Sequence, residues 1–184
     1  MDATTALHQT NDLVTTMVSS LTNEHREMAT PCEGWTVHDV LGHMCGGAQM
    51  IAGAMQGQAP PSEAPDFLAD GPAAGWAAAS AALAAAATPE ALAAKHQMPF
   101  GEVPGEVAVS VIAADFITHA WDLSQATGID HGISDELAAF ALQTWMPVVP
   151  AEGRTGDGFK PAVNVGADAS PLDKLVGYTG RTPA

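Results

Sequence analysis

Apolar residues recur at helical spacing through much of this chain. The first such repeat covers residues 4–28, and its apolar members are Leu7, Val14, Met17, Val18, Leu21 and Met28. Residues three and four apart share one face of an α-helix, so the repeat predicts an amphipathic first helix. The connector that follows, residues 30–35, contains a proline and a glycine and predicts a turn-rich break.

A second helix is predicted from Thr36 to near residue 57. Asp39 follows Thr36 by three residues, which resembles a capping box with Asp in place of the usual Glu. His43 lies on or beside the face that carries Val40. We therefore expect the His43 side chain to point inward.

The rest of the chain predicts further helices between irregular segments. The predicted elements are an alanine-rich helix over 73–87, a short helical turn from Pro89, an irregular segment Lys95–Gly105, a long helix from Glu106 to Gly128, and a helix capped by Ser134 and ended by Pro147. The tail, residues 150–184, contains a β-like stretch, Ala162–Val165, and a final helical turn after Pro171. Four sizeable helices predict an all-α fold, an antiparallel four-helix bundle with a short irregular or β-like C-terminal tail.

Length and composition indicate the number of domains, the compartment and the classes of partner. At 184 residues the chain suits one domain, residues 1–184. Six Lys and Arg stand against 21 Asp and Glu, a formal charge of −15, which disfavours binding to nucleic acid or to an anionic membrane surface. The two cysteines are too few for a disulfide framework, and the first eight residues lack the pattern of a secretory signal. We expect a cytoplasmic protein, with a homodimer as a possible assembly.

Two polar residues interrupt the most apolar predicted helix. Asp115 and His119 are four residues apart, so they lie one turn above the other on the same helix face. Burying either group without a partner is costly. A shared divalent metal would satisfy both, and so would a hydrogen bond between the two side chains; the spacing leaves both interpretations open.

His43 supplies a third candidate ligand from a different helix. His43, Asp115 and His119 together would form a set of three protein ligands with one position free, as in catalytic metal sites. Zinc, nickel, iron and manganese all accept such ligands. We take zinc as the first choice.

Other polar residues have structural explanations that we prefer. Asp39 could pair with His43 at a second metal, but its capping position is a sufficient role. Cys45 is expected to pack as a small apolar residue. Asp122 could orient the imidazole of His119, but we place first a bond to a Trp or Arg side chain from the tail. The remaining histidines are expected at the solvated surface: His8, His25, His38, His96 and His131.

Two blocks of residues resemble a known family. Residues 30–37 (Thr-Pro-Cys-Glu-Gly-Trp-Thr-Val), followed by His43, form the first block, and Asp115 to Leu123, followed by Ala126-Thr-Gly128, form the second. They resemble the mycothiol-dependent maleylpyruvate isomerase N-terminal family, which belongs to the DinB/YfiT-like metal-binding four-helix bundles, in its compact single-domain actinobacterial form. The resemblance places the family's metal ligands on His43, Asp115 and His119, with Asp115 where the founding isomerase has Glu.

The resemblance also implies an activity. It points to a metal-dependent thiol S-transferase or isomerase that takes a low-molecular-weight thiol, mycothiol, and acts on a small electrophile. Alternatives are a metal-dependent hydrolase or lyase with the same site, a protein that binds a metal or small ligand without turnover, and a helical bundle whose His–Asp pair is structural. For positioning a substrate we select the tail cations Arg154 and Arg181.

Overall fold

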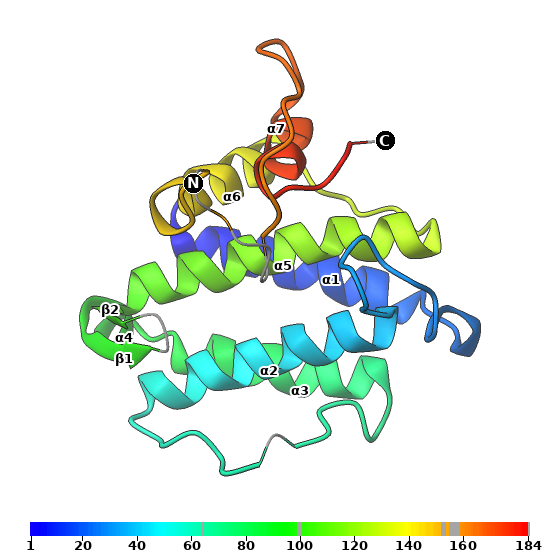
Figure 1. Ribbon diagram of the computed structural model, residues 1–184. Coiled ribbons are helices and arrows are strands. Elements are labelled where there is room, and N and C mark those ends of the chain that lie inside the picture. Colours follow the sequence, from blue (N-terminus) through cyan, green and yellow to red (C-terminus); the bar gives the residue numbers. More distant parts are fainter. Residues whose placement is uncertain (64, 99–100, 152–153, 155–158, 184) are drawn as a thin grey trace.

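The computed structural model describes residues 1–63, 65–98, 101–151, 154 and 159–183. These residues form seven α-helices and one two-stranded hairpin (Figure 1). The helices are α1 (Ala3–Ser19), α2 (Val37–Met55), α3 (Pro72–Ala86), α4 (Pro89–Ala93), α5 (Gly105–Thr127), α6 (Asp135–Val148) and α7 (Pro171–Tyr178), with a 3-10 turn η1 (Asn23–His25) and strands β1 (Lys95–Met98) and β2 (Gly101–Pro104).

Four long helices contact one another in a closed set of pairs. α1 packs on α3 and α5, and α2 packs on the same two helices. α5 crosses the middle of the molecule, with α2 on one side and α6 and α7 on the other (Figure 1). The predicted helical class is therefore correct for most of the chain; the antiparallel bundle order stays a prediction.

The start of α2 has the predicted capping box. The Thr36 side chain accepts a hydrogen bond from the Asp39 backbone N–H, and Asp39 accepts one from the Thr36 backbone N–H at 2.8 Å. These bonds satisfy backbone donors that an uncapped helix would leave without partners. The structural role predicted for Asp39 is confirmed, and its carboxylate is used at the helix end rather than at a metal.

A close approach between α2 and α5 brings their polar faces together. A side chain at Gly47 would place its Cβ 2.9 Å from Ile112 Cδ1 on α5, so the end of the Ile112 side chain would have to move. Gly47 lies one turn after His43 and Ile112 lies one turn before Phe116. This contact therefore holds His43 opposite the central turns of α5.

One predicted boundary and two predicted segments differ from the structure for local reasons. The first helix ends at Ser19, because Thr22 forms its own capping box over η1 and the later repeat member Met28 is exposed. The segment predicted as irregular contains the hairpin of β1 and β2, paired antiparallel from Lys95↔Pro104 to Met98↔Gly101. The β-like stretch at 162–165 forms no strand; Val163 donates a backbone hydrogen bond to Gly177 of α7 instead.

α5 is the core helix of the described structure. By length and composition it could cross a membrane, but 72% of its most apolar window is buried inside the protein. Its apolar residues pack on every side, which leaves Asp115, His119 and Asp122 as polar groups in an apolar setting. The C-terminal glycine predicted for this helix is present as Gly128, with a left-handed φ of 74°.

Candidate metal centre

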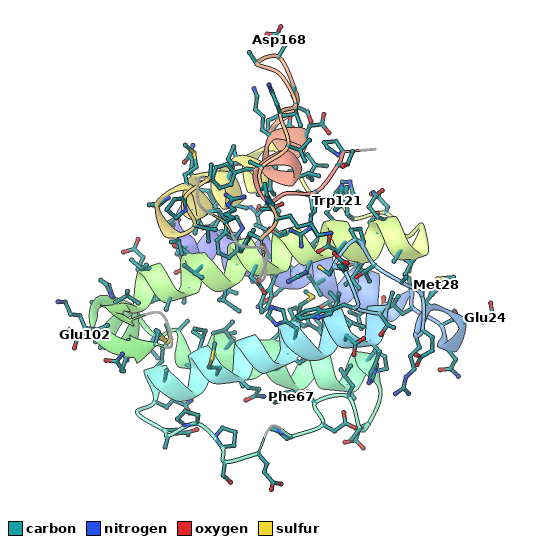
Figure 2. The ribbon with its side chains drawn as sticks, in the orientation of Figure 1. Glu24, Met28, Phe67, Glu102, Trp121 and Asp168 are labelled. Carbon is teal, nitrogen blue, oxygen red and sulfur yellow. The ribbon has the colours of Figure 1, made fainter. Side chains whose placement is uncertain are left out.

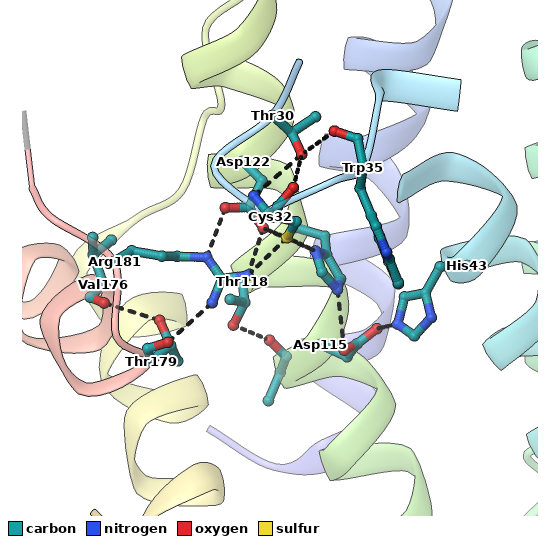
Figure 3. A network of polar contacts seen from close by, with 12 residues as sticks. Thr30, Cys32, Trp35, His43, Asp115, Thr118, Asp122, Val176, Thr179 and Arg181 are labelled. Atoms are coloured by element: carbon teal, nitrogen blue, oxygen red, sulfur yellow. Dashed lines mark hydrogen bonds and ion pairs between the residues drawn. The ribbon is translucent and has the colours of Figure 1, made fainter. Parts of the chain in front are cut away.

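The structure brings the three predicted ligands together (Figure 3). His43 Nε2 lies 3.3 Å from Asp115 Oδ2, and His119 Nε2 lies 3.5 Å from Asp115 Oδ1. One candidate ligand atom from each residue falls within 4.8 Å of the other two. The helical spacing of Asp115 and His119 places these two on one face, and the packing of α2 on α5 adds His43.

One oxygen of this group lacks a hydrogen bond. Asp115 Oδ2 is buried and has no hydrogen-bond partner among the described residues, although His43 Nε2 lies 3.3 Å from it as an ion-pair contact. A buried carboxylate oxygen without a donor is costly. An imidazole–carboxylate–imidazole donor set fits a divalent ion such as zinc, which would satisfy that oxygen.

The charges of the site reinforce one another. Burial opposes the ionised form of Asp115, but the nearby imidazoles of His119 and His43, which attract its negative charge, outweigh burial and hold the pKa of Asp115 below its ordinary value. Burial likewise opposes a charge on His119, yet Asp115 and the hydrogen bond to Asp122 raise its pKa well above the ordinary value. Without a metal, the group is thus a buried ion pair whose histidine holds a proton that a metal would replace.

The second ring nitrogen of His119 faces a different set of partners. Nδ1 lies 2.9 Å from Asp122 Oδ2 and 3.8 Å from Cys32 Sγ. Asp122 is fully buried, and Arg181 donates to both of its oxygens, at 2.6 Å from Nε and 2.7 Å from Nη2. Burial would raise the pKa of Asp122, but the hydrogen bonds from His119 and Arg181 lower it. Asp122 therefore has both predicted roles, since it orients an imidazole and binds a tail arginine.

Cys32, His119 and Asp122 form a second group that could hold a metal. Their ligand atoms also lie within 4.8 Å of one another. We did not predict Cys32 as a site residue, because its place in the turn after Pro31 is at no spacing typical of a metal ligand. Cys45, by contrast, is fully buried as predicted.

Both groups lie at one pocket of about 600 Å³. Trp35 forms part of its wall, with its ring 5.1 Å from the His43 ring and stacked at 6.2 Å on His119. Trp121 of α5, labelled in Figure 2, also lines the pocket. The pocket is further lined by Pro31, Glu33, Thr118, Gln125, Phe159, Lys160, Thr179, Gly180 and Thr182.

The contacts of the two tail arginines differ from the substrate-positioning role that we expected for them. The Arg154 guanidinium donates to the carbonyls of Val149, Pro150, Lys160 and Tyr178, so it is a structural residue of the tail. Arg181 lies in the pocket but is engaged by Asp122. Lys160, which we did not select, lines the pocket with its side chain 51% exposed and pairs with Glu33 at 3.0 Å.

The other histidines are not brought to this site. Each has a local contact or lies at the surface: His8 near Asp12, His25 in the η1 capping box, His38 near Arg26, His96 at the Ala91 carbonyl and His131 at the Ile133 N–H. None of these five appears in either described group of ligand atoms.

Comparison with known proteins identifies the family of this chain. The family model of the mycothiol maleylpyruvate isomerase N-terminal domain matches residues 7–124, a range that includes Cys32, His43, Asp115, His119 and Asp122. Two uncharacterized proteins of Mycobacterium tuberculosis, Rv0738 and MT0763, are each 31% identical to this chain over 183 residues, 99% of both lengths. No solved structure matches this sequence significantly. The chain belongs to the mycothiol maleylpyruvate isomerase N-terminal domain family, as its two sequence blocks had indicated.

Proposed function

We propose that this protein binds a divalent metal, zinc as first choice, through His43, Asp115 and His119, and uses it in a thiol-dependent transferase or isomerase reaction. The observation that carries the proposal is the convergence of these three ligands, with a buried and unpartnered Asp115 oxygen, at a pocket of about 600 Å³. Family membership supports mycothiol as the thiol, since the family includes a mycothiol-dependent isomerase. The supporting scaffold is the proposed antiparallel four-helix bundle.

The residues around the ligands prepare them for this role. Asp122 accepts the Nδ1–H of His119, so that Nε2 is the nitrogen that would give up its proton and hold the metal beside Asp115 and His43. Trp35 packs against both imidazole rings and restricts their rotation. A divalent ion, when bound, lowers the pKa of a thiol at its open position.

The pocket has room and polarity for a thiol and a small electrophile. A volume of about 600 Å³ lies within the range of small-molecule sites. Lys160 is the lining cation better placed to position an anionic group among the described residues, because its pair with Glu33 is exposed to solvent whereas Arg181 is buried against Asp122. In a transfer, the thiol gives its proton to solvent, its sulfur forms a bond to the electrophilic carbon, and the leaving group departs with its electron pair. In an isomerisation, the thiolate adds to a carbon–carbon double bond whose electron pair moves onto a conjugated carbonyl, and the return of that pair re-forms the double bond and expels the thiolate.

One experiment on a matched set of variants tests the proposal. Protein purified without chelator is analysed for metal, and mycothiol consumption is followed with chlorodinitrobenzene as the electrophile. We expect about one ion per chain and metal-dependent consumption in the wild type, and loss of both in His43→Ala and His119→Ala, because each removes one of three ligands. His131→Ala, whose imidazole accepts from the Ile133 N–H away from the site, keeps both.

Each contrary result has a distinct meaning. Equal metal loss in all three variants contradicts the ligand assignment. Thiol consumption that persists in chelator contradicts the metal-dependent reaction. A bound metal without thiol consumption contradicts the enzymatic part and leaves a metal-binding protein.

A further inference from the structure

Two possible metal sites share one histidine. His119 presents Nε2 to Asp115 and His43, and Nδ1 to Asp122 and Cys32. Both groups have their ligand atoms within 4.8 Å. The second group contains a thiol, which zinc and other thiophilic ions favour. Something in the structure must therefore disfavour the second group if the first is to hold the ion.

Arg181 contacts both of the other members of the second group. Its Nε lies 2.6 Å from Asp122 Oδ1, and its Nη2 lies 2.7 Å from Asp122 Oδ2 and 3.3 Å from Cys32 Sγ (Figure 3). Asp122 Oδ2 also accepts from Cys32 Sγ at 3.2 Å and lies 2.9 Å from His119 Nδ1. The carboxylate is thus occupied by donors on both oxygens, and a buried cation lies where a dication would otherwise be attracted.

The backbone before Arg181 is shaped for this contact. Gly180 has a left-handed φ of 83°, and a Cβ there would lie 2.5 Å from the Lys160 carbonyl oxygen. A side chain at this position would be excluded by both the conformation and the space. Thr179, buried, accepts from Arg181 Nη1 through its carbonyl at 3.3 Å. The tail therefore delivers the guanidinium to Asp122 from 59 residues away in sequence.

We propose that Arg181 is a positioning residue that selects the metal site: by pairing with Asp122 and Cys32 it blocks the Cys32–His119–Asp122 group and leaves His119 to the His43–Asp115–His119 group. The inference rests on the proposed metal binding. It adds a prediction that metal binding alone does not make. Loss of the arginine frees a carboxylate and a thiol beside His119, and the metal then gains a sulfur ligand.

Cobalt(II) reports the change directly, because a thiolate bound to cobalt gives an intense near-ultraviolet charge-transfer absorption that nitrogen and oxygen ligands do not. The wild type is expected to bind cobalt without this absorption. Arg181→Met, which removes the charge and keeps an unbranched side chain, is expected to show it. The double variant Arg181→Met/Cys32→Ser is expected to lose it again. Arg26→Met, an exposed arginine that pairs with Glu27, is the matched control and keeps the wild-type spectrum.

A second measurement keeps the inference testable if Arg181→Met does not fold. Cys32→Ser alone is expected to leave the cobalt spectrum of the wild type unchanged, because Cys32 is not a ligand while Arg181 is present. A sulfur absorption in the wild type, a change of spectrum in Cys32→Ser, or a folded Arg181→Met that binds cobalt without the absorption would each overturn the inference. A wild type that binds no cobalt or zinc would defeat the proposed function itself, and is distinguished from these by its lack of any bound metal.

Discussion

At the scale of single residues, the two cysteines of this chain lie in opposite environments. Cys45 on α2 is fully buried among apolar side chains, and burial raises its pKa to about 11. Cys32 is half-buried at the pocket, where a guanidinium, a carboxylate and an imidazole contact its sulfur. The same side chain is therefore an apolar packing element at one position and a polar contact at the other.

This difference makes a prediction about thiol reactivity and alkaline stability. In folded protein at pH 8, a disulfide reagent should react with Cys32 and not with Cys45. After the protein is unfolded in denaturant, Cys45 should react as well.

Burial of Cys45 also makes stability depend on pH. The folded state holds Cys45 protonated up to a pKa of about 11 whereas the unfolded thiol ionises near 9.0, so the free energy of unfolding should fall as the pH rises between these values. Cys45→Ala should lack this part of the decline. Urea unfolding of both proteins from pH 8 to pH 11 measures the free energy of unfolding. The same fall with pH in the two proteins would contradict the raised pKa of Cys45.

At the scale of elements, the C-terminal segment is attached to the helices by a few specific contacts. α7 packs on α6, and Arg154 joins the end of α6 to α7 through the Val149 and Tyr178 carbonyls. Its guanidinium also lies 4.6 Å from the centre of the Tyr178 ring. Since the same segment carries Arg181, these contacts also position the partner of Asp122.

Replacing Arg154 should loosen this segment. Arg154→Lys keeps the charge but loses the planar fork that reaches four carbonyls, and unmet carbonyls of this kind cost about 1–3 kcal/mol. We expect faster amide hydrogen exchange in α7, with little change in the central turns of α5. Lys174→Arg on α7 is the control, because it exchanges one long cationic side chain for another within that helix. An equal increase of the exchange rate in α5 and α7 would mean that Arg154 stabilises the whole fold and not this segment alone.

At the scale of the whole molecule, the proposed site joins two helices from separate parts of the chain. His43 lies on α2, Asp115 and His119 lie on α5, and all three line the pocket. An ion held by all three links these helices in the folded state and finds no such arrangement in the unfolded chain. Metal binding should therefore stabilise the entire fold.

Metal removal measures this linkage. With free zinc at about 100 times its dissociation constant, the folded state should gain about 2.7 kcal/mol. Thermal unfolding should therefore occur at lower temperature after chelation and recover when zinc is restored. His131→Ala should show the same zinc-dependent rise, and His43→Ala should not. A rise in His43→Ala equal to that of the wild type would indicate zinc binding elsewhere.

Local physical rules in the sequence account for the helices and for half of the site. Helical periodicity and caps placed α2, α3 and α5 closely, because Thr36, Asp39 and Gly128 act through backbone groups within a few residues. The relation of Asp115 to His119 was predictable for the same reason, since four residues span one helical turn. His43 was predicted as the third candidate from its place beside the Val40 face of the second helix, and the family resemblance assigned the same three residues. The resemblance itself is confirmed by the family match.

Tertiary structure alone decided the contacts between distant segments. The sequence did not predict the hairpin of β1 and β2, the end of α1 at Ser19, or the contacts of Cys32 with Asp122 and Arg181. It predicted a tail Trp or Arg side chain on Asp122, and the fold decided that this side chain is Arg181. A short strand needs a partner strand, and a buried charge needs a counter-charge, but neither requirement determines which residues supply them. That choice depends on how α2, α5 and the tail pack, because side chains far apart in the chain become neighbours only through packing.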